Sequence, residues 1–110
     1  MTEYDIHTPG MRADDATAAL ERIVSDERAR GSGVFAVITG YGSRGGTSVI
    51  RDAVLRACSR YAALNHIRGY MPGDQAGDPF APLHRSFPDA WSIPARYRRS
   101  PNPGMVFICV

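Results

Sequence analysis

The chain has 110 residues, 44% of them hydrophobic, so it can close one modest core without metal or disulfide staples, and we expect a single domain over residues 1–110. It shows no basic leader and no long apolar run, which predicts a cytoplasmic protein without a signal peptide or membrane span. The net charge of +2 is too small to indicate nucleic acid by itself, and Cys58 and Cys109 lie in apolar segments that predict reduced thiols.

A strand and a helix are predicted for the first thirty residues. Residues 3–7 form a short β-type run, and apolar residues at helical spacing follow it: Ala16, Ala19, Leu20, Ile23 and Val24. Asp14 and Asp15 would lie in the first turn of the helix, where carboxylates complement its dipole, and Gly31 would end it.

A second strand and helix follow in the same order. Residues 34–38 are uninterrupted apolar strand formers, which is typical of a covered central strand. After the glycine-rich residues 39–46, Thr47 or Ser48 can cap a helix with one apolar face: Ile50, Ala53, Val54, Ala57 and Tyr61.

Two further strands are predicted at residues 67–71 and 105–110, with an irregular segment between them. Residues 72–103 hold most of the prolines and show no helical or strand period, so we expect a weakly packed insertion. The order βαβαββ with right-handed crossovers predicts an α/β fold, in which a mixed sheet carries both helices on one face and ends in an antiparallel pair.

The first candidate site is a pair of polar residues on one face of the first strand. Asp5 and His7 are two residues apart, so their side chains project together. Because the first two strands should run parallel, His7 and Thr39 would both lie at the carboxyl edge of the sheet, where open α/β folds bind ligands.

The second candidate site is the turn that begins at Thr39. Its glycines let a ligand approach the backbone, the helix N-terminus after it attracts anions, and Arg44 adds a charge. The residues expected to bind phosphate are Thr39, Gly40, Tyr41, Gly42, Ser43, Arg44 and Arg51.

Simpler interpretations compete with each of these. The turn matches neither the Walker nor the dinucleotide pattern, so it can be an ordinary turn, and Asp5 and His7 can be surface residues that pair with nearby groups. Trp91 with the arginines of residues 96–99 resembles a single-strand binder, but a loop that covers the sheet would look alike.

Taken together, the motifs and their order resemble the Smr (small MutS-related) domain family. Residues 5–7 resemble its Asp-Leu-His strand, residues 10–16 its Gly-Met and acidic helix start, and residues 38–42 its Thr-Gly-x-Gly or His-Gly-x-Gly turn. The resemblance covers residues 2–71 and 104–110. Thr8-Pro9 separate His7 from Gly10, whereas the family usually has glycine directly after the histidine.

The resemblance implies a two-layer βαβαββ sandwich that binds nucleic acid and nicks DNA or cleaves RNA, here as a stand-alone domain. Asp5 and His7 would be catalytic: His7 would move the proton, and Asp5 would orient it or hold Mg²⁺ or another divalent cation. Two alternatives remain open: a nucleic-acid-binding module without catalysis, and a protein that binds a small anion or nucleotide.

Overall fold

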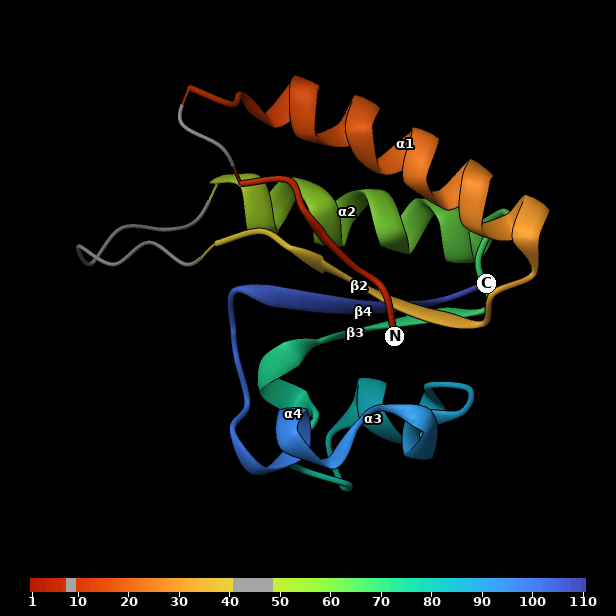
Figure 1. Ribbon diagram of the computed structural model, residues 1–110, viewed down its shortest axis with the longest axis vertical. Helices are drawn as coiled ribbons and strands as arrows, with labels where there is room; N and C mark the ends of the chain where they lie inside the picture. The colour runs from red at the N-terminus through yellow and green to blue at the C-terminus, as the bar shows by residue number, and fades with distance from the viewer. Residues whose placement is uncertain (8–9, 41–48) are drawn as a thin grey trace.

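The computed structural model describes residues 1–7, 10–40 and 49–110, and these form a mixed four-stranded sheet between two helical layers (Figure 1). The strand order is β1-β2-β4-β3. β1 runs parallel to β2, whereas β4 lies antiparallel to both of its neighbours, β2 and β3. The strands are β1 (Glu3–Asp5), β2 (Val34–Ile38), β3 (Gly69–Pro72) and β4 (Met105–Cys109).

Two long helices, α1 (Ala13–Arg30) and α2 (Val49–Ala63), cover one face of the sheet. The side chains of Leu20, Phe35 and Val54 are fully buried between these helices and the strands. At the end of α1, Gly31 adopts a φ of 62°, and its N–H donates to the carbonyl of Arg28 at 3.1 Å. The predicted α/β fold, with both helices on one face of a mixed sheet, is therefore confirmed.

The opposite face is covered by residues 73–103, and here the structure differs from the expected weakly packed insertion. The segment forms short helical turns, and its Phe87 and Ile93 are buried against Met71 and Phe107 of the sheet. Each turn is only three to five residues long, which is too short to produce a helical period in the sequence. The turns are η1 (Gly73–Gln75), α3 (Pro82–Ser86), η2 (Ala90–Ser92) and α4 (Ala95–Arg99).

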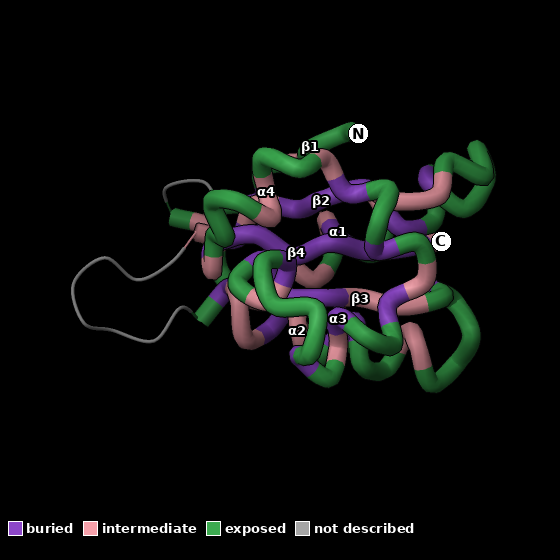
Figure 2. Tube along the Cα trace, turned by 90° about the horizontal axis from the view of Figure 1, so that it is seen from below, coloured by how far each residue is buried: buried purple, intermediate pink, exposed green. Residues whose placement is uncertain are grey.

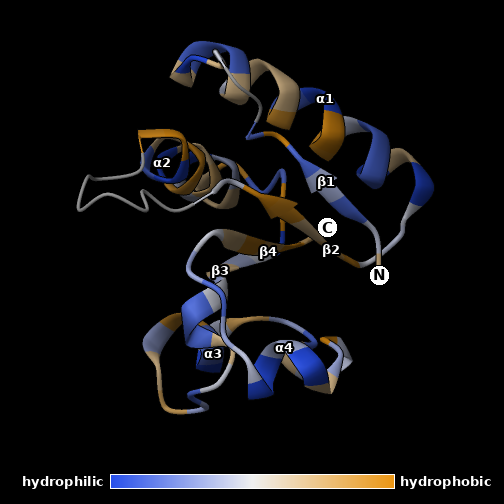
Figure 3. Ribbon diagram, turned by 60° about the vertical axis from the view of Figure 1, so that its left-hand side comes forward, coloured by the Kyte–Doolittle hydropathy of each residue, from blue (hydrophilic) through white to orange (hydrophobic). Residues whose placement is uncertain are grey.

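β4 is the most enclosed strand of the sheet. All five of its residues are buried, because α1 and α2 cover one side of it and residues 73–103 cover the other (Figure 2). Figure 3 shows the hydrophobic residues of β2 and β4 concentrated between the two helical layers. Side chains on both faces of such a strand are buried, so the strand is a continuous apolar run in the sequence and does not alternate between apolar and polar residues.

Both cysteines lie in the core of the domain. Cys58 and Cys109 are free and buried, as expected, and burial raises the pKa of the Cys58 thiol to about 12. Among the described residues, no helix is both long enough and apolar enough to cross a membrane.

A buried carboxylate ties α1 to β1. The side chain of Glu27 is 2% exposed and accepts hydrogen bonds from the hydroxyls of Tyr4 and Ser32 and, at 3.0 Å, from the guanidinium of Arg30. Burial acts to raise the pKa of Glu27, but these hydrogen bonds and the charge of Arg30 outweigh it and hold the pKa below its ordinary value. The ionised carboxylate therefore stabilises the fold.

We expect Glu27→Gln to lower the free energy of unfolding at pH 7 by about 1.5–3 kcal/mol, because charge-assisted hydrogen bonds are lost. The folded-state pKa lies below the unfolded value, so this contribution is fully present above about pH 4.5 and disappears as the pH falls through the folded-state pKa. Urea denaturation at several pH values should show the two proteins converging in acid. The control is Glu21→Gln, an exposed carboxylate on the same helix; a constant difference at all pH values would contradict the assignment.

Candidate functional site

The carboxyl ends of β1 and β2 lie side by side, as the sequence predicted for parallel strands. Asp5 is in register with Ile38, and the N–H of Ile6 donates to the carbonyl of Ile38 at 3.0 Å. His7 and Thr39 therefore follow at the same edge of the sheet. α1 and α2 both begin at this edge, as Figure 1 shows.

The imidazole of His7 lies directly over Gly40. A Cβ atom built on Gly40 would stand 2.6 Å from Cγ and 2.7 Å from Nδ1 of His7, which is closer than real atoms approach. The φ of Gly40 is +70°, so glycine is favoured here by the backbone as well as by the ring. The predicted meeting of the two motifs is present, although Thr8-Pro9 lengthen the chain after His7.

Asp5 acts on the backbone of His7. Its carboxylate accepts a hydrogen bond from the His7 N–H at 2.9 Å, a local turn of the kind that aspartate favours. The carboxylate thereby fixes where the chain leaves β1, and both side chains remain exposed. Asp5 belongs to no group of three or more potential metal ligands within residues 1–7, 10–40 and 49–110.

The first two amides of the predicted phosphate-binding turn are occupied by the protein itself. The N–H groups of Thr39 and Gly40 donate to the carbonyl of Gly104 at 2.7 and 3.2 Å, and the Thr39 hydroxyl donates to the same oxygen at 3.2 Å. Thr39 is fully buried. These two residues therefore hold the end of β2 against the start of β4, and their predicted contact with phosphate stays a prediction.

Arg51 is also engaged by the fold. Its Nε donates to the carbonyl of Pro103 at 2.8 Å, and Nη2 lies 3.5 Å from a carboxylate oxygen of Asp74. The guanidinium thus joins α2 to both ends of the segment that covers the second face, whereas the sequence analysis assigned it to phosphate. The other predicted residues of the turn, Tyr41, Gly42, Ser43 and Arg44, lie outside the described part of the chain.

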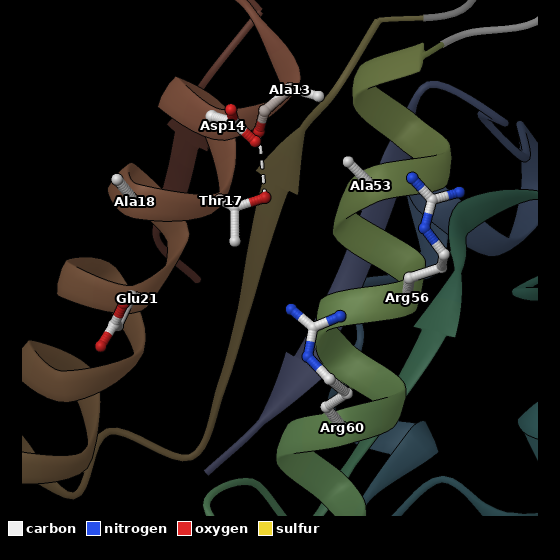
Figure 4. Close-up of a pocket in the computed structure, with 8 residues that line it drawn as sticks. All are labelled: Ala13, Asp14, Thr17, Ala18, Glu21, Ala53, Arg56 and Arg60. Atoms are coloured by element: carbon white, nitrogen blue, oxygen red, sulfur yellow. Dashed lines mark hydrogen bonds between the residues drawn. The ribbon is translucent and has the colours of Figure 1, made fainter.

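A groove of about 410 Å³ lies between α1 and α2 (Figure 4). Asp14 and Glu21 of α1 and Arg56 and Arg60 of α2 line it, and Figure 4 shows the guanidinium of Arg60 directed toward α1 and that of Arg56 directed along α2. No ion pair within 4 Å joins these walls in the described structure. Arg56 and Arg60 are four residues apart, so they lie on the same exposed face of α2. This spacing is the signal in the sequence that could have indicated a cationic wall of the groove.

Comparison with known proteins resolves the family. The Smr domain family matches residues 4–77, which is 74 of the 110 residues. The chain belongs to the Smr family. Neither the curated proteins nor the solved structures gave a match. The Smr match includes Asp5, His7 and Gly40 and ends before α3, so most of the segment that covers the second face lies beyond it.

We expect Gly40→Ala to displace the His7 ring and to destabilise the Smr domain by more than the roughly 1–2 kcal/mol that left-handed backbone costs a non-glycine residue. Gly31→Ala is the matched control, since its φ of +62° is similar and an added Cβ meets nothing within 4 Å. Urea denaturation gives the two free energies, and the imidazole resonances of His7 in NMR spectra report the displacement. Equal stability of both variants with unmoved His7 resonances would contradict the contact.

Proposed function

We propose that this Smr domain binds the backbone of a nucleic acid at the carboxyl edge of its sheet and cleaves it there as an endonuclease. One observation carries the proposal: the His7 imidazole, beyond the end of β1, lies over Gly40, beyond the end of β2. The His7 imidazole, which can transfer protons, thus lies beside a glycine, whose backbone a ligand can approach because it has no side chain. Both residues belong to the motifs that the family shares.

His7 would perform the proton transfer. Its side chain is exposed, so an attacking oxygen can come within hydrogen-bond distance of the ring. In hydrolysis His7 takes the proton of the attacking water, and in RNA transesterification it takes the proton of the ribose 2′-hydroxyl. The new P–O bond replaces the bond from phosphorus to the leaving oxygen, which takes a proton from solvent. Asp5 contributes by fixing the backbone from which the imidazole projects.

The phosphate would be held by residues around His7. The N–H groups of Thr39 and Gly40 already donate to the carbonyl of Gly104. On the basis of the sequence, we therefore assign phosphate binding to the residues that follow: Tyr41, Gly42, Ser43 and Arg44. Exposed cations near this edge add long-range attraction for a polyanion. They are Arg12 at the start of α1 and Arg56 in the middle of α2.

A second candidate is a nucleic-acid-binding Smr module without catalysis. The observation that favours it is the hydrogen bond of the Asp5 carboxylate, which goes to the backbone of His7. In catalytic pairs the carboxylate usually fixes the tautomer of the imidazole. The two candidates differ in one expectation: removal of the His7 ring reduces cleavage in the endonuclease, whereas the binding module shows no cleavage that could be lost.

We expect His7→Ala to reduce cleavage at least about 100-fold while affinity changes less than about twofold, because general acid–base catalysis acts in the transition state. The measurement uses labelled supercoiled plasmid and structured RNA, with Mg²⁺ or with EDTA. His66→Ala is the matched control, since His66 is exposed at the far end of α2 and stacks on Tyr61.

Asp5→Asn separates the roles of the carboxylate in the same experiment. The amide oxygen can still accept the His7 N–H, so a purely positional Asp5 tolerates the change, whereas a tautomer-fixing or metal-binding Asp5 does not. Indistinguishable nicking by wild type, His7→Ala and a mock preparation would exclude the endonuclease and leave the binding module.

We expect the affinity for the nucleic-acid backbone to fall steeply as the salt concentration rises. Arg44→Ala should reduce the slope of the logarithm of the binding constant against the logarithm of the salt concentration by roughly one unit. The control is Arg28→Ala, an exposed arginine near the opposite end of α1. Fluorescence anisotropy with a labelled duplex at several salt concentrations gives both slopes. A slope that changes equally in the two variants would assign the effect to net charge and not to the turn.

A further inference from the structure

The segment that covers the second face presents an exposed tryptophan. Trp91, in η2, is the only tryptophan of the chain and is 76% exposed. Its neighbours in the sequence, Ala90 and Ile93, are buried against the sheet, so the element that carries Trp91 is anchored while the indole faces solvent. Exposure of a large apolar side chain to water is unfavourable, so a fixed, exposed indole indicates a surface that a partner covers.

An arginine lies over the indole. The guanidinium carbon of Arg98, in α4, is 5.0 Å from the centroid of the Trp91 ring, and the His84 ring meets the indole edge-on at 6.4 Å. Nη1 of Arg98 is buried and has no hydrogen-bond partner in the described structure. No carboxylate there lies within 4 Å of Arg98, so its positive charge remains available to a ligand.

A hollow of about 370 Å³ borders the indole, with Arg85 and Asp89 as its charged residues. Its size falls within the roughly 300–1,000 Å³ of small-ligand clefts. Arg98 of α4 adds a second cation beside the indole, so Arg85 and Arg98 outnumber the single carboxylate of Asp89 here. The remaining lining residues are Pro79, His84, Phe87, Ala90 and Trp91.

We propose that Trp91 and Arg98 form a stacking site for an unpaired base of a single-stranded nucleic acid. The indole supplies a flat surface for the base, and Arg98 with Arg85 attracts the phosphates on either side of it. Bases within a duplex already stack on their neighbours, so the site selects single strands or loops. This site rests on the proposed function, because it requires that the nucleic acid bound at the His7 edge also contains unpaired bases.

The single tryptophan makes the site directly observable, because a base stacked on the indole quenches its fluorescence. Titration of the full chain with a single-stranded oligothymidylate should quench the emission, whereas a duplex of the same length should leave most of it. Trp91→Ala should weaken binding of the single strand, measured by anisotropy, about 5- to 150-fold, the factor that corresponds to roughly 1–3 kcal/mol of base stacking.

Two matched variants test the geometry. Phe80→Ala removes an aromatic side chain of similar exposure, 79%, from the same segment, and should change affinity less than about twofold. Arg98→Ala and Arg99→Ala remove equal charge, but only Arg98 lies over the indole, so only its loss should reduce the maximal quench.

Quenching by the single strand with these variant effects supports the site. Absence of quenching, equal quenching by the duplex, or equal losses in Trp91→Ala and Phe80→Ala would overturn it. The titration requires no cleavage, so failure of the endonuclease proposal appears as unchanged phosphodiester bonds, whereas failure of the stacking site appears as unchanged indole emission.

Discussion

The carbonyl oxygen of Gly104 is the acceptor on which the carboxyl edge of this domain depends. It receives the N–H of Thr39, the N–H of Gly40 and the hydroxyl of Thr39. Three donors on one oxygen fix the chain where it leaves β2, and Gly40 is held with a positive φ beneath the His7 ring. The backbone over which the exposed His7 imidazole lies is thus held by Gly104, a residue far away in the sequence, just before β4.

This dependence explains which parts could be predicted from the sequence. Helical periodicity was sufficient for α1 and α2, and apolar runs were sufficient for β2 and β4, because those signals are local. The approach of His7 to Gly40 followed from one further rule, that parallel strands end at a common edge. The use of the Thr39 and Gly40 amides could not be predicted, since it requires knowing that β4 inserts between β2 and β3 in a defined register.

The fold contacts of Arg51 and the packing of residues 73–103 were not predicted from the sequence, for related reasons. An arginine in the first turn of a helix after a glycine-rich loop favours a phosphate contact, but a peptide carbonyl and a carboxylate satisfy the same guanidinium, and here Pro103 and Asp74 supply them. The segment 73–103 gains its order from burial of Phe87 and Ile93 on the sheet and not from helical propensity. Most of it lies beyond the Smr match, so this chain builds its second helical layer from residues outside the shared region.

The central place of β4 has a consequence for synthesis on the ribosome. β4 lies between β2 and β3, and residues 105–109 are synthesised after the other three strands. At roughly 5–20 residues per second, translation of the stretch from Gly73 to Gly104 takes a few seconds, during which the growing chain exposes two unpaired strand edges. The sheet therefore cannot be assembled strand by strand in the order of synthesis, and the interval before β4 appears is when the nascent chain most needs protection from aggregation.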